Sequence, residues 1–218
     1  MTSAEKDLSK HAEIADRIIG NIVQAGGPAV SPDGSTVAFV VGRVDMTKNK
    51  NLSQIWLAAA DGSTPPRAVT NGDFDGEPAW SPDGRLLAFA SRRSAKAGEG
   101  TLHVLPVASH GETLTIATMK EGVSDTSWSP DGRWIAFTSR VPDARYEAED
   151  ESWQPPRKIE RFFSKLDNEG WIFDRPKHVY VVAADGTGAP RDLTPGEFQH
   201  GSIAWMPDSS GLVVSAQR

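Results

Sequence analysis

Short runs of alternating apolar and polar residues recur along most of the chain, and this period of two predicts β-strands. A first set of runs, rich in β-branched and aromatic residues, spans 36–41, 86–91, 134–139 and 212–216. A second set follows the first three runs, at 54–58, 102–107 and 178–183. Shorter segments then end at Val69-Thr70, Ile116-Ala117 and Leu193-Thr194. The pattern indicates an all-β fold with several strands in each repeat.

The same turn motif precedes each strand of the first set. It reads Ser31-Pro32-Asp33-Gly34, Ser81-Pro82-Asp83-Gly84, Ser129-Pro130-Asp131-Gly132 and, in degraded form, Met206-Pro207-Asp208-Ser209. Proline fixes φ, and Asp-Gly supplies local hydrogen bonding and a positive φ, so the motif predicts a tight hairpin turn. Its prolines are separated by 50, 48 and 77 residues. The chain therefore repeats every 48 to 50 residues, and the third unit is longer by roughly 28 residues.

Four short antiparallel strands per repeat are typical of a β-propeller blade. We predict a partial propeller of about three and a half four-stranded blades. The complete blades span about 28–72, 77–120 and 125–196, and an incomplete fourth spans 203–218. Trp80, Trp128 and Trp205 occupy equivalent positions in the last three units, and we assign them to the core.

Residues 1–27 lack the repeat and are assigned to an N-terminal extension. Thr2 and Glu5 have the spacing of a capping box, and apolar residues follow at helical intervals from Leu8 to Ile22, which predicts a short helix. The segment 18–23 would equally suit a strand. The sequence leaves both readings open.

The additional residues of the third unit form an insertion at about 141–177. Its first half contains the densest acidic run of the chain, with Glu147, Glu149, Asp150 and Glu151 between Tyr146 and Trp153. Asp167-Asn168-Glu169-Gly170 is a strong turn sequence between two aromatic-rich arms, so we expect the second half to form a hairpin. The acidic run is read either as a solvated loop or as a surface that faces a substrate.

Composition narrows the range of functions. The 218 residues contain no cysteine, which excludes disulfides, thiolate nucleophiles and thiolate metal sites. The net charge of −6, with neither sign gathered in a long block, argues against nucleic acid or an anionic membrane as a partner. We find no signal peptide or membrane-spanning stretch and expect a cytoplasmic protein.

Motifs for self-contained catalysis are missing. Residues 122–126 come nearest to a G-x-S-x-G nucleophile elbow, but Thr126 stands in place of the closing glycine. The segment 71–76 resembles the start of a calcium loop, but Pro82 stands at the twelfth position instead of glutamate, which favours turn chemistry. The five histidines are scattered; His103 and His178 fall in strands, where a hydrogen-bonded structural role is expected. We therefore predict no cofactor and no metal.

Several of these segments together resemble a known family. They are the Trp-Ser-Pro-Asp-Gly-Arg motifs, Asp174-Arg175-Pro176-Lys177-His178, Arg191-Asp192-Leu193-Thr194 and His200-Gly201-Ser202-Ile203-Ala204-Trp205. They look like the N-terminal propeller of the prolyl oligopeptidase family, in the branch of acylaminoacyl peptidases and dipeptidyl aminopeptidases. The resemblance covers about 28–218. It implies a propeller of about seven or eight blades and a C-terminal α/β-hydrolase domain with a Ser, Asp, His triad, to which no position here corresponds.

By that resemblance, we expect the chain to be the noncatalytic, substrate-gating propeller portion of a serine peptidase that acts on short peptides. Its partners would be the hydrolase domain of the same parent chain and the peptide, and bare blade edges leave room for a homo-oligomer. Relatives that remove dipeptides hold the substrate's amino group with propeller carboxylates, which makes Glu147, Glu149, Glu151 and the neighbouring Trp153 candidates for substrate contact. The alternative is a TolB-like propeller scaffold that binds a protein partner and has no enzymatic activity.

Overall fold

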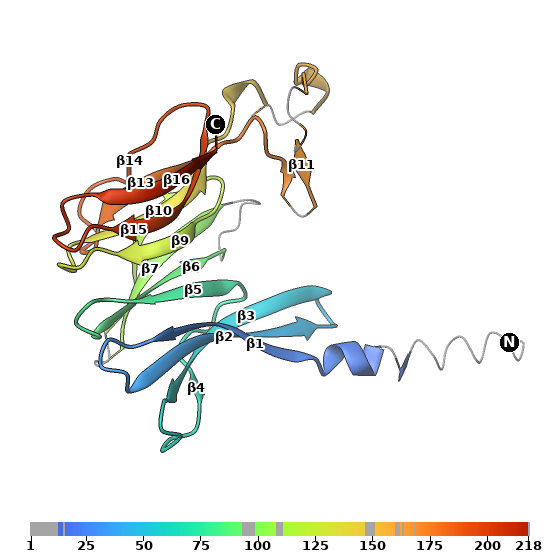
Figure 1. Cartoon of the computed structure of the whole chain (residues 1–218). Helices are drawn as coiled ribbons and strands as arrows, with labels where there is room; N and C mark the ends of the chain where they lie inside the picture. The colour runs from blue at the N-terminus through green and yellow to red at the C-terminus, as the bar shows by residue number, and fades with distance from the viewer. Residues whose placement is uncertain are drawn as a thin grey trace, which may run out of the picture. The chain divides into compact units, whose positions relative to one another are not determined.

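The computed structural model describes residues 13–14, 16–92, 99–107, 111–146, 151–159, 162, 164–167 and 169–217 (Figure 1). The fold is all-β, and its four-stranded antiparallel sheets are blades of a partial β-propeller, as predicted. The chain divides into two compact units, 1–78 and 79–218. No helix in the described part of the chain is long and apolar enough to cross a membrane.

The first unit contains one complete blade. Its strands are β1 (Val23–Val30), β2 (Thr36–Asp45), β3 (Lys50–Ala59) and β4 (Arg67–Ala68), which pair in this order with antiparallel neighbours. Residues 16–20 before β1 are helical. The side-chain alternation of β3 places Ile55 and Leu57 in the core of this blade, where Ala38 of β2 is also buried.

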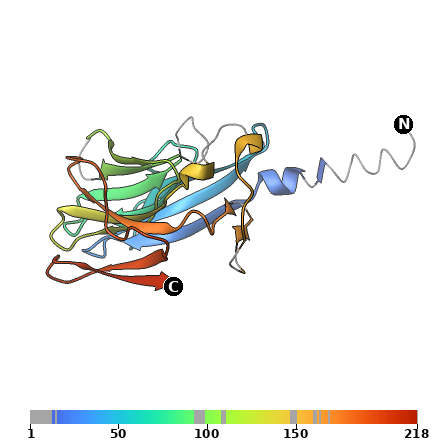
Figure 2. The same cartoon turned by 90° about the horizontal axis from the view of Figure 1, so that it is seen from above.

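Two further four-stranded sheets and one pair of strands follow along the chain. The second blade comprises β5 (Asp75–Trp80), β6 (Leu86–Ser91), β7 (Gly100–Pro106) and β8 (Leu114–Met119). The third comprises β9 (Ser124–Trp128), β10 (Trp134–Arg140), β13 (Lys177–Ala183) and β14 (Arg191–Asp192). The last pair is β15 (Gln199–Trp205) and β16 (Leu212–Gln217), and β15 lies beside β9 and β13 (Figures 1 and 2).

The insertion between β10 and β13 holds four short elements. They are the 3-10 helices η1 (Ala144–Tyr146) and η2 (Glu151–Trp153) and the strands β11 (Lys165–Leu166) and β12 (Gly170–Trp171). The two strands pair antiparallel, with Lys165 opposite Trp171. The second half of the insertion therefore contains a hairpin, as the turn sequence predicts.

Each Ser-Pro-Asp-Gly motif closes its hairpin with the same hydrogen bonds. The serine hydroxyl donates to the aspartate Oδ1 two residues on, at 2.5 Å from Ser31 and 2.6 Å from Ser81 and Ser129. The same Oγ accepts from the backbone N five residues on, at 2.9 to 3.0 Å. The glycines have φ between +70° and +73°, where a Cβ would cause strain. The bonds from Ser31 and Ser35 lower the pKa of Asp33 to about 2.

A residue in the left-handed conformation recurs in the first strand of each of the four units. These residues are Gly27, Glu77, Asp125 and Ser202, with φ between +51° and +56°. Each stands three residues before the tryptophan position of its unit, which is Val30 in the first blade. Register shifts mark β-bulges in β1, β9 and β15. Because a bulge increases twist and redirects a side chain, the repeated position gives these three strands the same local bend.

Stacked aromatic pairs fill the second and third blades. Phe89 is fully buried and stacks on His103, with ring centroids 5.1 Å apart. Phe137 is also fully buried and stacks on Tyr180 at 5.6 Å. Each pair lies directly opposite in the register of its two central strands. Such a pair contributes about 0.5–1.5 kcal/mol beyond the burial of its area.

The tryptophans assigned to the core differ in burial. Trp128 is buried in a cluster with Ala88 and Ile135, which confirms the prediction for that residue. Trp80 and Trp205 are only half-buried, so the prediction is too strong for them; Trp205 lies in a sheet of two strands and has fewer neighbours. The indole Nε1 of Trp128 donates to the carbonyl of Ala79 at 3.0 Å, and that of Trp205 donates to the carbonyl of Ser127 at 3.1 Å. In both cases the indole bonds a later sheet to the one before it.

Candidate functional site

Of the four candidate substrate-contact residues in the acidic run, the structure describes only Glu151 and Trp153. Glu147 and Glu149 lie outside the described residues. Glu151 begins η2, and Trp153 at its end is 81% exposed. The role suggested for these four residues by resemblance therefore stays a prediction.

The insertion occupies the end of the third blade opposite to its Ser-Pro-Asp-Gly turn. β10 starts beside that turn and ends at Arg140, and the insertion follows directly. Figure 1 shows the hairpin labelled β11 standing apart from the sheet of β9, β10, β13 and β14 to which its insertion belongs. Because loops on a rigid scaffold are where binding residues concentrate, this end is the first candidate for function.

A buried arginine fastens the hairpin to the blade. The side chain of Arg140 is 9% exposed, and its Nε and Nη2 both donate to Glu169 Oε2, at 2.9 and 2.6 Å. Its Nη1 donates to the carbonyl of Arg175 at 2.9 Å. The charge-assisted bonds from Arg140 lower the pKa of the Glu169 carboxyl. All three nitrogens of this guanidinium are thus used to hold the insertion.

A second arginine completes the attachment from the other side. Arg175 donates from Nε to the carbonyl of Trp171 at 2.7 Å and from Nη2 to the carbonyl of Glu169 at 2.5 Å. Its Nη1 forms an ion pair with Glu121, in the connection between β8 and β9. Arg140 and Arg175 together join the hairpin, the end of β10 and the β8–β9 connection into one network.

A third arginine lies among aromatic rings. Arg157 donates from Nε to Asp174 Oδ2 at 2.8 Å, and the Asp174 side chain is 2% exposed. The guanidinium carbon of Arg157 is 4.0 Å from the ring centroid of Tyr146 and 5.3 Å from that of Trp171. Phe173 packs its ring edge-on against Trp171, with centroids 6.1 Å apart. This group joins the first part of the insertion to the hairpin.

The two strand histidines have structural partners. His103 lies between the hydroxyls of Thr101 and Thr115, at 2.8 and 3.0 Å from its ring nitrogens. His178 lies 2.7 Å from Asp192 Oδ2 and 2.8 Å from the carbonyl of Gly196. Both rings are buried, which agrees with the structural role predicted for them. Among the described residues, no group of three His, Cys, Asp or Glu side chains could hold a metal ion.

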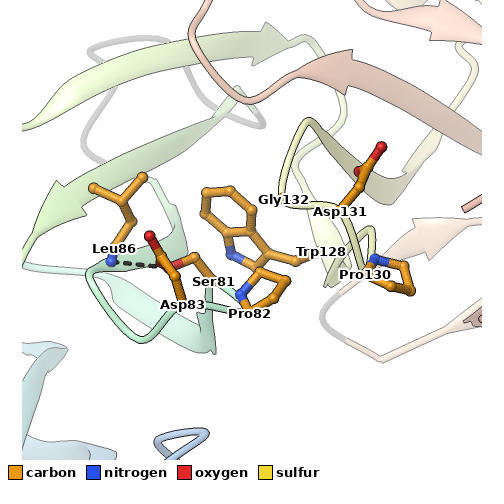
Figure 3. A pocket seen from close by; sticks show the side chains of 8 residues that line it. All are labelled: Ser81, Pro82, Asp83, Leu86, Trp128, Pro130, Asp131 and Gly132. Carbon is orange, nitrogen blue, oxygen red and sulfur yellow. Dashed lines mark hydrogen bonds between the residues drawn. The ribbon is translucent and has the colours of Figure 1, made fainter.

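A hollow of about 380 Å³ lies at the opposite end of the blades, between the Ser-Pro-Asp-Gly turns of the second and third (Figure 3). Its lining consists of Ser81, Pro82, Asp83, Leu86, Trp128, Pro130, Asp131 and Gly132. The pKa values of Asp83 and Asp131 are lowered, mainly because the serine of each turn donates to the carboxylate. These carboxylates are therefore engaged in their own turns, and the insertion end remains the stronger candidate.

Sequence reasoning missed the arginines of the insertion end. The segment Asp174-Arg175-Pro176-Lys177-His178 supported the family resemblance, but no role followed from it for Asp174 or Arg175. The sequence did not indicate the partners of Arg140 and Arg157, because Glu169 and Asp174 lie 29 and 17 residues further along the chain. The usable hint was a basic residue directly after an apolar strand, at Arg140.

Comparison with known proteins gives a family match and one curated relative. Residues 16–150 match the TolB beta propeller domain. The uncharacterized peptidase YuxL of Bacillus subtilis (strain 168) is 32% identical over 204 residues, which cover 89% of this chain and 30% of that protein. The chain thus spans about 30% of the length of the curated relative it matches.

Solved structures share the fold. An acylaminoacyl peptidase of Pyrococcus horikoshii superposes with a TM-score of 0.65 at 19% identity, over 89% of this chain and 28% of that one. The putative TolB from Agrobacterium tumefaciens superposes with a TM-score of 0.52 at 16% identity, over 89% of this chain and 70% of that one. At these identities the likeness shows the fold alone.

Proposed function

The chain belongs to the family of TolB β-propeller domains, and on that premise we propose that it is the noncatalytic propeller portion of a serine peptidase acting on short peptides. The observation that carries the proposal is the similarity of 89% of this chain to 30% of a protein named as a peptidase. The missing nucleophile elbow agrees with a part that does not itself catalyse.

The chemistry would belong to a C-terminal α/β-hydrolase domain of the same parent chain. There a peptide bond would be cleaved by acyl transfer to a serine activated by a histidine. The propeller would gate this step by admitting only short or unfolded peptides. We propose a cytoplasmic location.

We propose first that the acidic run recognises the free amino group of a peptide. Glu149→Gln and Glu151→Gln should lower kcat/KM of the whole peptidase for a peptide with a free amino group. The same peptide with an acylated amino group should be cleaved as before, because it offers no cation to the carboxylate. Equal losses on both peptides, or none on either, would remove Glu147, Glu149, Glu151 and Trp153 from the site.

The test of the function itself compares the 218-residue chain with the product of its complete gene. The 218-residue chain should hydrolyse neither acylamino-acid nor dipeptide chromogenic substrates, while the complete product should hydrolyse them. That activity should disappear with a serine-directed inhibitor or on replacement of the elbow serine. A complete product without a hydrolase domain, or without peptidase activity, would overturn the proposal.

A TolB-like scaffold that binds a protein partner is the second candidate. The family match and the putative TolB structure, of which this chain covers 70%, support it. It predicts a specific protein complex and no hydrolysis by the complete gene product.

A further inference from the structure

The three arginines of the insertion end differ in how their nitrogens are used. Arg140 and Arg175 each donate from Nε, Nη1 and Nη2 to protein acceptors. Arg157 donates from Nε alone, to Asp174. Within the described part of the chain, nothing accepts a hydrogen bond from its Nη1 or Nη2. Since a guanidinium carries five N–H donors, most of those of Arg157 remain unused.

The unused edge of Arg157 is held in place from two directions. The Tyr146 ring lies 4.0 Å from the guanidinium carbon, and the Trp171 ring lies 5.3 Å from it, distances at which a cation is attracted to an aromatic face. The ion pair with Asp174 fixes the Nε side. Stacking leaves the in-plane N–H groups of a guanidinium available, and the Arg157 side chain is 22% exposed, so a ligand can reach it from solvent.

Stability alone does not explain the ion pair. Asp174 Oδ1 is buried and makes no hydrogen bond with the described residues. A buried carboxylate with an unsatisfied oxygen carries a desolvation penalty that a well-packed apolar pair would avoid. Asp174 therefore acts mainly as the residue that positions Arg157.

The charges around Arg157 favour an anion. Arg145 lies 5.5 Å from the Tyr146 ring centroid, and Lys165 lies 5.4 Å from that of Trp171. Asp143 is engaged by Arg145, which lowers the pKa of the Asp143 carboxyl, and Asp174 is engaged by Arg157. The described cluster thus holds three cations and two carboxylates, and both carboxylates are already paired.

We propose that Arg157 anchors a carboxylate-binding site, in which Nη1–H and Nη2–H donate in parallel to the two oxygens of one carboxylate. The source of the carboxylate is a peptide, either its C-terminus or an acidic side chain. The inference rests on the proposed function only in naming a peptide as the source of the carboxylate. It gives the insertion an anion site on its described part, in addition to the amine-binding role suggested for the acidic run.

The test is a titration of the 218-residue chain with three small peptides, followed by the NMR signal of the Trp171 indole N–H. The peptides are N-acetyl-Ala-Ala-Ala with a free carboxylate, the same peptide as its amide, and N-acetyl-Ala-Glu-Ala amide. The free acid should bind roughly tenfold more tightly than its amide, because only the acid accepts two charge-assisted bonds. Binding of the glutamate peptide would identify any carboxylate as the ligand, and its failure would restrict the site to C-termini.

Two variants and a matched control locate the site. Arg157→Lys keeps the charge but lacks the two-pronged donor, so acid binding should weaken by roughly tenfold. Arg157→Gln should weaken it at least as much. Arg191→Gln removes an exposed arginine of β14, outside the cluster, and should change binding by about twofold or less.

Three outcomes would overturn the site: equal binding of acid and amide, unchanged binding in Arg157→Lys, or no binding at about 10 mM peptide, where even millimolar affinity would be detected. Carboxylate binding by this chain, together with a complete gene product that hydrolyses no peptide, would overturn the proposed function and leave the site standing. Hydrolysis by the complete gene product, without carboxylate binding by this chain, would leave the proposed function standing and overturn the site.

Discussion

The two ends of the third blade are held by different kinds of contact. At the Ser-Pro-Asp-Gly end, Ser129 bonds to Asp131 and Trp134, two and five residues away. At the insertion end, Arg140 bonds to Glu169 across 29 residues, and Arg175 to Glu121 across 54. The first set recurs in the other blades with the same atoms, whereas the second depends on an insertion found only in this blade.

This difference separates the framework from the part that can specialise. Local side-chain hydrogen bonds fix each turn independently of the segments around it, so the same short motif can be repeated along the chain. Long-range ion pairs need several segments to arrive together, and they position side chains such as Arg157 that the turns cannot reach. Stability and recognition are therefore assigned to opposite ends of one blade.

The largest effect is expected from Phe137→Ala, in the strand that joins the two ends. Phe137 is fully buried against Tyr180, so truncation should lower the free energy of unfolding by about 3–5 kcal/mol. Urea denaturation measures the loss, and both ends should be lost in one transition. Phe89→Ala, at the equivalent position of the second blade, is the matched control. A loss below about 1 kcal/mol would show that the blade does not depend on this packing.

The next effect is expected from Arg140→Met, which removes the guanidinium but keeps an apolar side chain of similar reach. Glu169 is 45% exposed and can be hydrated, so the loss should be about 1–3 kcal/mol and confined to the hairpin. Limited proteolysis between 157 and 171 should be faster by about tenfold, because that change corresponds to about 1.4 kcal/mol of local opening.

Arg145→Gln provides the comparison for the hairpin experiment, since Arg145 forms an exposed ion pair within three residues. Such a pair contributes less than about 1 kcal/mol, so cleavage should hardly change. If Arg140→Met lowered the global stability as much as Phe137→Ala does, the insertion would be part of the framework and the contrast between the ends would fail.

The framework was predictable because its signals are local. The period-two runs gave the strands, and the Ser-Pro-Asp-Gly motifs placed the turns, since the serine, aspartate and glycine act within five residues. The bulges were not predictable. Three of the four left-handed residues are Glu77, Asp125 and Ser202, and a positive φ at such residues is imposed by the neighbouring strand instead of by their own preference.

The sequence predicted where the candidate site lies, but not which side chains form it. The insertion and its hairpin followed from the longer third repeat and the turn sequence at 167–170. The acidic run attracted attention because charge density is visible in a sequence. Arg157 and Asp174 did not, because what distinguishes them is a buried carboxylate and two unused nitrogens, which are properties of the folded neighbourhood.

An effect of similar size is expected at the turn end, from Ser129→Ala. The change removes the donor to Asp131 and leaves the backbone N of Trp134 without its side-chain acceptor, at a fully buried serine. The free energy of unfolding should fall by about 1–3 kcal/mol. Ser81→Ala should cost the same to within about 1 kcal/mol, since its bonds have the same lengths to 0.1 Å. A larger gap in thermal or urea unfolding would show that the turns are not equivalent.

The smallest effect concerns the first turn and pH. Because Ser31 and Ser35 hold the pKa of Asp33 at about 2, below its ordinary value of 3.8, the folded state favours the carboxylate. This contribution to stability is present above about pH 4 and is lost as pH falls from about 4 to about 2. Ser31→Ala removes the main cause, so the midpoint of the Asp33 carboxyl carbon in an NMR titration should rise toward 3.8.

Ser63→Ala serves as the control for that titration, because the Ser63 side chain is the main cause of the lowered pKa of Asp61, in another turn of the same blade. It should raise the midpoint of Asp61 and leave that of Asp33 unchanged, since each serine acts only on its own turn. A rise of both midpoints in either variant would show that the two turns are coupled. The local character of the framework end, on which its contrast with the insertion end depends, would then be wrong for this blade.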